Sequence, residues 1–174
     1  MLVNAPLSTE TAKEVREWSD EISDRVMNDL LKAVLARVKK VDRDHDVPYA
    51  AGYSQNGEII YIDRHMPKSF VHDGRRVQTD RFLILHETVE KALLDELGLH
   101  YLHAHQIALR TERAAVEAAG IPWSRYNAFT QENAKKIADE RLTNVPSDLD
   151  LTPYRDEKDF EKLKQLAAAE NPEG

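Results

Sequence analysis

The apolar residues recur with two different periods, and these periods divide the chain into helical and extended segments. From Ser8 or Thr9 to Lys40 the apolar residues follow one another at steps of three and four. This spacing predicts one long helix with a single buried face. The stripe consists of Val15, Trp18, Ile22, Val26, Leu30, Val34 and Val38.

After Val47 the pattern changes to short extended runs. Residues 49–53 and 58–63 are typical of two strands, and Asn56–Gly57 lies between them. Asn-Gly is a strong hairpin signal because both residues tolerate a positive φ. The run from His72 to Arg75 indicates a second tight turn. We therefore expect a small antiparallel hairpin sheet, which is stable only when helices cover it.

Helical periodicity returns near residue 80. Thr79 or Asp80 favours the start of a helix that ends at Leu97, because Gly98 is a common residue just after a helix. A second helix is expected over residues 100–119. Its connection to the first is short, so the two should pack as antiparallel neighbours.

The remainder of the chain predicts a helix over 124–142, a loop over 144–153 and a short charged helix over 156–169. The expected architecture is α+β and mainly helical. It comprises one domain over residues 1–145, followed by a C-terminal loop and short charged helix over 146–174. The aspartates of this last part, Asp148, Asp150, Asp156 and Asp159, are expected on a solvated face.

Composition narrows the classes of function. The 174 residues suit one domain, and 24 Lys and Arg against 31 Asp and Glu give a net charge of −7. That balance argues against a nucleic-acid partner, since phosphate binding needs clustered positive charge. Apolar runs fall far short of the roughly 20 residues of a membrane helix, and the first residues lack the pattern of a secretory signal. We therefore expect no membrane partner and a cytoplasmic protein.

The chain has no cysteine and seven histidines. Disulfides, thiolate nucleophiles and Cys-type zinc fingers are excluded, so a metal would need His, Asp or Glu ligands.

Two consecutive helices each place a histidine and a glutamate inside their apolar stripe. On a helical wheel of residues 80–97, His86 and Glu90 lie among the leucines and Glu87 lies at the border of the stripe. In residues 100–119 the same holds for His105 and Glu112. A buried carboxylate without a partner costs several kcal/mol, so four such residues on neighbouring helices predict a shared site.

The segment His86-Glu87-Thr88-Val89-Glu90 resembles the His-Glu-x-x-His motif of the zincin-type metallopeptidases, with Glu90 at the position of the second histidine. The order of elements over residues 48–115 is also similar: a small sheet with an edge strand, the motif helix, and a third ligand from the next helix. The resemblance implies that His86 and Glu90 are metal ligands and that Glu87 is the general base. It also implies a third ligand, either His105 or Glu112.

The resulting hypothesis is a metal-dependent hydrolase in which His86, Glu90 and His105 hold one divalent metal. Zinc is expected first, and Mn or Fe would suit a site with both glutamates bound. Glu112 is either a fourth ligand or orients a histidine. Glu87 takes a proton from water as the water attacks an amide or ester carbonyl, so a peptide or protein is the expected partner.

Two alternatives stay open. The same residues can form a structural metal site or a metal-free His/Glu network in a non-catalytic binding protein, with Glu87 as a surface residue paired to Lys91. A carboxylate-bridged di-metal centre is less favoured, because Glu-x-x-His pairs are required and Ala115 stands three residues after Glu112. The oligomeric state is not encoded in any of these patterns.

Overall fold

The computed structural model describes residue 29 and residues 32–171, and the chain divides into two compact units, Met1–Ala36 and Arg37–Gly174. The predicted long helix from Ser8 or Thr9 lies mostly outside the described residues. Its predicted end at Lys40 is wrong, because helical backbone stops at Leu35. The backbone N–H groups of Lys39 and Lys40 instead donate to the Glu58 carbonyl, at 2.7 and 3.2 Å, which draws this stretch into a sheet.

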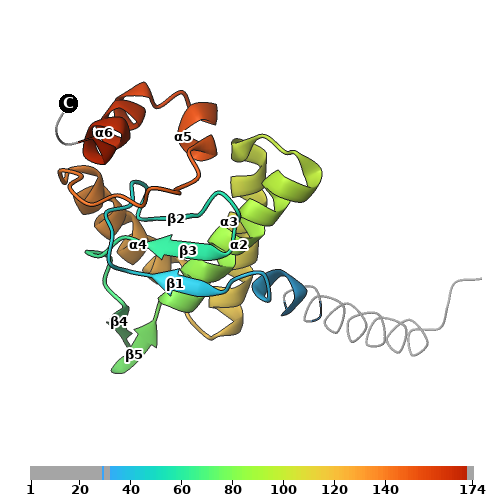
Figure 1. The fold of residues 1–174 in the computed structure, drawn as a ribbon. Helices are drawn as coiled ribbons and strands as arrows, with labels where there is room; N and C mark the ends of the chain where they lie inside the picture. Colours follow the sequence, from blue (N-terminus) through green and yellow to red (C-terminus); the bar gives the residue numbers. More distant parts are fainter. Residues whose placement is uncertain (1–28, 30–31, 172–174) are drawn as a thin grey trace, which may run out of the picture. The chain divides into compact units, whose positions relative to one another are not determined.

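The second unit has a mainly helical α+β architecture (Figure 1). Its elements, in chain order, are β1 (Lys40–Asp42), β2 (Ala51–Tyr53), β3 (Ile59–Ile62), β4 (Ser69–His72), β5 (Arg75–Gln78), α2 (Asp80–Leu97), α3 (Tyr101–Ala118), α4 (Trp123–Ala138), α5 (Thr152–Asp156) and α6 (Phe160–Glu170).

Both predicted hairpins are present. β2 and β3 pair antiparallel around Gly57, whose φ is 73°, and β4 and β5 pair antiparallel around Asp73 and Gly74, with φ of 48° and 74°. The sequence pattern missed β1, which pairs parallel with β3 and makes a three-stranded sheet of order β1-β3-β2. β2 is therefore an edge strand of this sheet.

The helix pair is confirmed. α2 starts at Asp80 and ends at Leu97, where Gly98 adopts the left-handed conformation with φ of 59°. α3 follows after a short link, and the two helices pack side by side. α2 also contacts β2 and β3, so it lies in the centre of the unit.

The C-terminal part differs from the prediction in two ways. α4 ends at Ala138, four residues before the expected end. α6 covers most of the expected last helix, but a further short helix, α5, begins within the expected loop, and Lys158, with a φ of 56°, lies between the two. Leu149, Tyr154 and Leu166 join one core cluster with Val47 and Tyr61. The segment after residue 145 thus shares a core with the sheet.

The expectation of a solvated acidic face for this segment is wrong, because each of the four aspartates has a specific partner. Asp148 accepts from the Tyr61 hydroxyl, Asp150 pairs with Lys91, Asp156 accepts from the Tyr101 N–H, and Asp159 accepts from the Tyr49 hydroxyl. Local charge pattern could not show this, since every partner is more than 50 residues away.

Among the helices of the described part, none is both long and apolar enough to cross a membrane.

Candidate metal centre

Three of the residues singled out by the sequence converge on one point. His86 Nε2 lies 3.2 Å from Glu90 Oε2 and 3.1 Å from His105 Nδ1, and His105 Nδ1 lies 2.9 Å from the same Glu90 oxygen. Zinc bound at 2.0–2.2 Å in tetrahedral geometry separates its ligand atoms by about 3.3–3.5 Å. The three atoms therefore lie within a few tenths of an ångström of the spacing that such a metal needs.

α2 and α3 create this convergence because His86 and Glu90 are one helical turn apart on α2, and His105 faces them from α3. His86 and Glu90 are buried, whereas the His105 side chain is 33% exposed. The cluster is thus closed on the α2 side and open at His105.

Glu112 lies behind His86 and outside this triangle. Its Oε2 is 2.7 Å from His86 Nδ1, the ring nitrogen that faces away from Glu90, and its Oε1 accepts a hydrogen bond of 2.5 Å from the Tyr126 hydroxyl. A carboxylate on Nδ1 holds the imidazole in place and leaves the Nε2 lone pair directed at the cluster. Of the two predicted roles for Glu112, the geometry favours orientation of His86.

Two tyrosines complete the surroundings. The Tyr53 hydroxyl of β2 donates to Glu90 Oε1 at 2.8 Å, so one Glu90 oxygen is held by the sheet and the other faces the histidines. Tyr101 is buried and has its hydroxyl 3.4 Å from His105 Nδ1. Sequence reasoning missed Tyr53 and Tyr126, because their partners lie 37 and 14 residues away and neither side chain has a local signal.

The hydrogen bonds within the cluster shift the pKa values of His86 and Glu90 in opposite directions. Burial alone lowers the pKa of the His86 imidazole, but hydrogen bonds with Glu112 and Glu90 outweigh burial and raise this pKa well above its ordinary value. Burial alone raises the pKa of Glu90, but hydrogen bonds from His105 and His86 hold it below its ordinary value. Without a metal the site therefore contains an imidazolium between carboxylates. A divalent cation would replace the positive charge of that imidazolium.

Glu87 differs from the other two glutamates because its carboxylate has no partner among the described residues. The residue is only 8% exposed, but no fully buried side-chain oxygen of the described part lacks a partner, so the Glu87 carboxylate opens to the hollows beside it. Burial, reinforced by the charge of Glu90, raises the pKa of Glu87 to about 8. A positive charge at the cluster would favour its ionised form.

The predicted surface pair between Glu87 and Lys91 is wrong. Lys91 is buried rather than solvated, and its Nζ lies 2.7 Å from Asp150 and 2.9 Å from Asp95. The segment around Asp150 covers the side of α2 on which Lys91 lies. Thr88, one turn before Lys91, is also buried.

Two hollows meet at the cluster. A cleft between the start of β2 and α4 has His86, Glu87 and His105 in its wall, opposite Asn127 and Gln131. A smaller cavity, lined by Tyr49, Tyr53, Tyr101 and Tyr154, also includes Glu87 and His105. Glu87 and His105 are thus accessible from both hollows.

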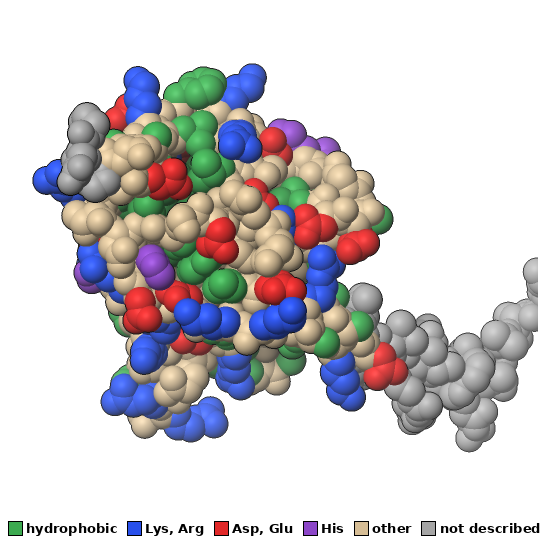
Figure 2. All heavy atoms as spheres, in the orientation of Figure 1, with side chains coloured by type: hydrophobic (Ala, Val, Ile, Leu, Met, Phe, Trp, Pro, Cys, Tyr) green, Lys and Arg blue, Asp and Glu red, His purple; other side chains and the backbone are tan. Residues whose placement is uncertain are grey.

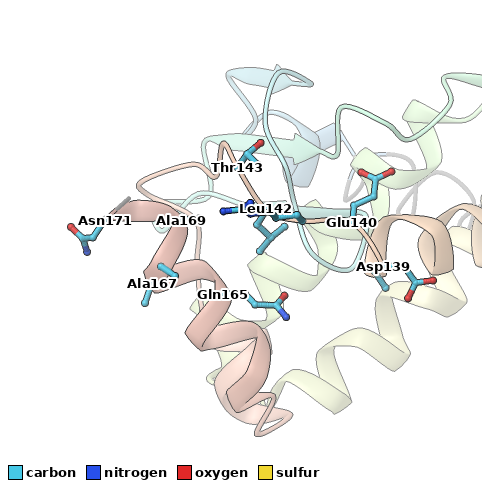
Figure 3. A pocket seen from close by; sticks show the side chains of 11 residues that line it. Asp139, Glu140, Leu142, Thr143, Gln165, Ala167, Ala169 and Asn171 are labelled. Atoms are coloured by element: carbon cyan, nitrogen blue, oxygen red, sulfur yellow. The ribbon is translucent and has the colours of Figure 1, made fainter. Parts of the chain in front are cut away.

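The largest hollow lies elsewhere, between the chain after α4 and the last turns of α6 (Figure 3). Asp139, Glu140, Leu142, Gln165 and Asn171 are among the residues in its wall, and none of the candidate site residues is. It therefore adds nothing to the metal hypothesis.

Asp46, Asp63 and His65 form a second group with metal-ligand chemistry. Asp46 accepts from the N–H groups of Thr143 and Asn144 and pairs with Arg64, whose Nε is 2.7 Å away. Asp63 accepts from two further backbone N–H groups. These carboxylates already serve the backbone and a guanidinium, so we do not assign a metal to them.

Comparison of the chain with protein-family models, with curated proteins and with solved structures finds no match.

Proposed function

We propose that this protein is a metal-dependent hydrolase of zincin-like type, with His86, Glu90 and His105 as ligands of one divalent metal and Glu87 as the general base. Zinc is the first choice of metal because two imidazole nitrogens and one carboxylate form the ligand set of catalytic zinc sites with an open position. Glu112 has the role of orienting His86.

One observation carries the proposal: three potential ligand atoms from two helices lie within 3.2 Å of one another, and the Glu87 carboxylate, which has no partner among the described residues, opens to the hollows beside them. A structural His/Glu network needs only the hydrogen-bonded carboxylates of Glu90 and Glu112. An accessible proton acceptor next to a metal is in addition a requirement of hydrolysis.

When bound, a divalent metal would polarise the substrate carbonyl and lower the pKa of water to near neutrality. Glu87 would accept the proton of the attacking water and return it to the leaving group. Tyr101, with its hydroxyl beside His105, is placed to donate a hydrogen bond to the substrate. Tyr53 holds Glu90, which keeps the ligand oxygen directed at the cluster.

The cleft supports a peptide or ester substrate. Ala51 lies in its wall and belongs to the edge strand β2, and the hydrogen-bonding pattern of β2 with β3 turns the Ala51 backbone N–H and C=O outward. The next outward carbonyl of β2, that of Tyr53, already accepts from the Asp150 N–H, so an extended chain would pair with this edge at Ala51, where Asn127 and Gln131 of α4 also line the cleft.

The competing candidate is a non-catalytic protein in which the same cluster is structural. It is favoured by the hydrogen bonds of Glu90 and Glu112, which use every one of their oxygens within the described residues. The two candidate functions differ in the role of Glu87, which is the general base of the hydrolase and has no role in a structural cluster.

The metal content of protein purified without a histidine tag tests whether the cluster of His86, Glu90 and His105 binds a metal at all. We expect about one equivalent of zinc or another transition metal after equilibration and dialysis. His105→Ala should lose most of it, whereas His103→Ala, an exposed neighbour on α3, should retain it. Less than a tenth of an equivalent with no uptake on titration would contradict every metal-based function.

A further inference from the structure

Basic side chains gather on the β4–β5 hairpin, away from the metal cluster. Figure 2 shows them at the lower left, over the place where Figure 1 has β4 and β5. They border a hollow, here called the hairpin groove, whose wall includes Arg75, Arg76, Gln78 and Arg81 on one side and Gly120 and Ile121 on the other. The groove is thus a patch of positive charge on a protein whose net charge is −7.

The three arginines of the groove have no acidic partner among the residues that the structure describes. Arg76 contacts only the Ser69 hydroxyl, at 3.1 Å, and the Arg81 guanidinium lies 4.5 Å from the centre of the Phe82 ring. All three side chains are exposed. Other surface arginines of the unit, such as Arg37 and Arg113, do form ion pairs.

The groove also follows an open strand edge. The Thr79 N–H donates a hydrogen bond to the Lys68 carbonyl just beyond the hairpin. Because hydrogen-bonded and non-hydrogen-bonded pairs alternate along antiparallel strands, Phe70 with Val77 and His72 with Arg75 are the hydrogen-bonded pairs. The backbone groups of Arg76 and Gln78 therefore face outward, and no described residue bonds to them. Outward N–H and C=O groups two residues apart are the template for adding a strand.

We propose that the hairpin groove binds an extended acidic peptide, which adds as a strand to β5 while its carboxylates pair with the guanidiniums of Arg75, Arg76 and Arg81. Arg75 and Arg76 follow each other on β5 and face opposite sides, with Arg75 on the side of the buried Val77, so a run of consecutive acidic residues is needed to meet both. Guanidinium forks match carboxylates in geometry as well as charge.

A peptide fits these observations better than other polyanions. Nucleic acid and lipid headgroups have no peptide backbone that could pair with the Arg76 and Gln78 edge. The proposal is independent of hydrolysis, because none of the groove residues belongs to the metal cluster.

Fluorescence anisotropy of a labelled peptide, Thr-Glu-Glu-Glu-Glu-Glu-Thr, titrated with the full chain tests the proposal. We expect saturable binding that weakens with salt and falls by roughly tenfold or more when Glu is replaced by Gln in the peptide. Arg76→Glu and Arg81→Glu should each weaken binding similarly. Arg155→Glu, the same charge change on α5, should leave it unaltered.

A second measurement leaves the protein unchanged and tests strand addition directly. N-methylation of alternate peptide amides in one register should abolish binding, and methylation in the other register should not. Equal affinity of both methylated peptides, or of the Gln peptide, would overturn the proposal. So would displacement of the peptide by single-stranded RNA or by anionic lipid vesicles at lower concentrations than by unlabelled peptide.

Discussion

Glu87 is the residue on which the catalytic interpretation depends. Its largely covered position and the charge of Glu90 raise the pKa of Glu87 to about 8, so Glu87 is largely neutral at pH 7 in the metal-free protein. A group with this pKa, beside a cluster that can receive a cation, can take and return a proton near neutral pH. Glu90, one turn further along α2, and Glu112, on α3, are occupied by hydrogen bonds and cannot do so.

Glu87→Gln tests this role. Because Gln preserves size but cannot accept a proton, we expect unchanged metal content and a loss of hydrolysis of about 100-fold or more. Hydrolysis of a quenched peptide library, measured with metal-loaded protein, reports the loss. Glu96→Gln, an exposed change at the end of the same helix, is the control. Equal activity of Glu87→Gln and the parent chain would remove Glu87 from the mechanism.

At the scale of elements, α2 shows where helical periodicity succeeds and where it fails. Its ends follow from local signals at Asp80 and Gly98, and its apolar stripe identified His86 and Glu90 as buried. The opposite side was expected in solvent, but Lys91 is covered by the segment around Asp150. A helix in contact with a sheet, a second helix and a C-terminal segment is buried on more than one face, and a wheel cannot show this.

The ion pair between Lys91 and Asp150 should hold that C-terminal segment on α2. Their side chains are 7% and 11% exposed, so Lys91→Met leaves a nearly buried carboxylate and should cost roughly 2–4 kcal/mol of unfolding free energy. Urea denaturation measures the loss. Lys136→Met, which breaks an exposed pair with Glu132, should cost less than about 0.5 kcal/mol.

A double-mutant cycle separates the pair from simple loss of packing. The variant carrying both Lys91→Met and Asp150→Asn should be at least about 1 kcal/mol more stable than the sum of the two single losses predicts. Strict additivity would show that the two side chains stabilise the protein independently of each other.

At the scale of the whole molecule, the candidate centre links elements that are distant in sequence. Its ligands come from α2 and α3, Glu112 connects to Tyr126 on α4, and Glu90 connects to Tyr53 on β2. An ion that binds this centre therefore binds only the folded chain, and its binding free energy adds to the stability of the fold.

Zinc should raise the melting temperature of the metal-free protein by an amount on the order of 10 °C at 100-fold excess over Kd. The effect should weaken as pH falls. Hydrogen bonds with Glu112 and Glu90 raise the pKa of His86, so zinc must displace a proton that the metal-free site holds more tightly than a free imidazole does, and affinity should rise by roughly tenfold per pH unit for each proton released. Calorimetric melts between pH 6 and 8 measure both effects, and a melting temperature indifferent to zinc would contradict the linkage.

The sequence by itself determined the elements whose signals are local: the two hairpins, the ends of α2, the course of α3, and the burial of His86, Glu90 and Glu112. Only the tertiary structure decided which atoms meet. It placed His105 Nδ1 at the ligand atoms of α2, turned Glu112 to the far nitrogen of His86, and brought Tyr53 and Tyr126 to the carboxylates. Burial follows from periodicity along one helix, whereas distance and direction between side chains depend on how separate elements pack. For the same reason the parallel pairing of β1 and the partners of the C-terminal aspartates had no signal in the local sequence.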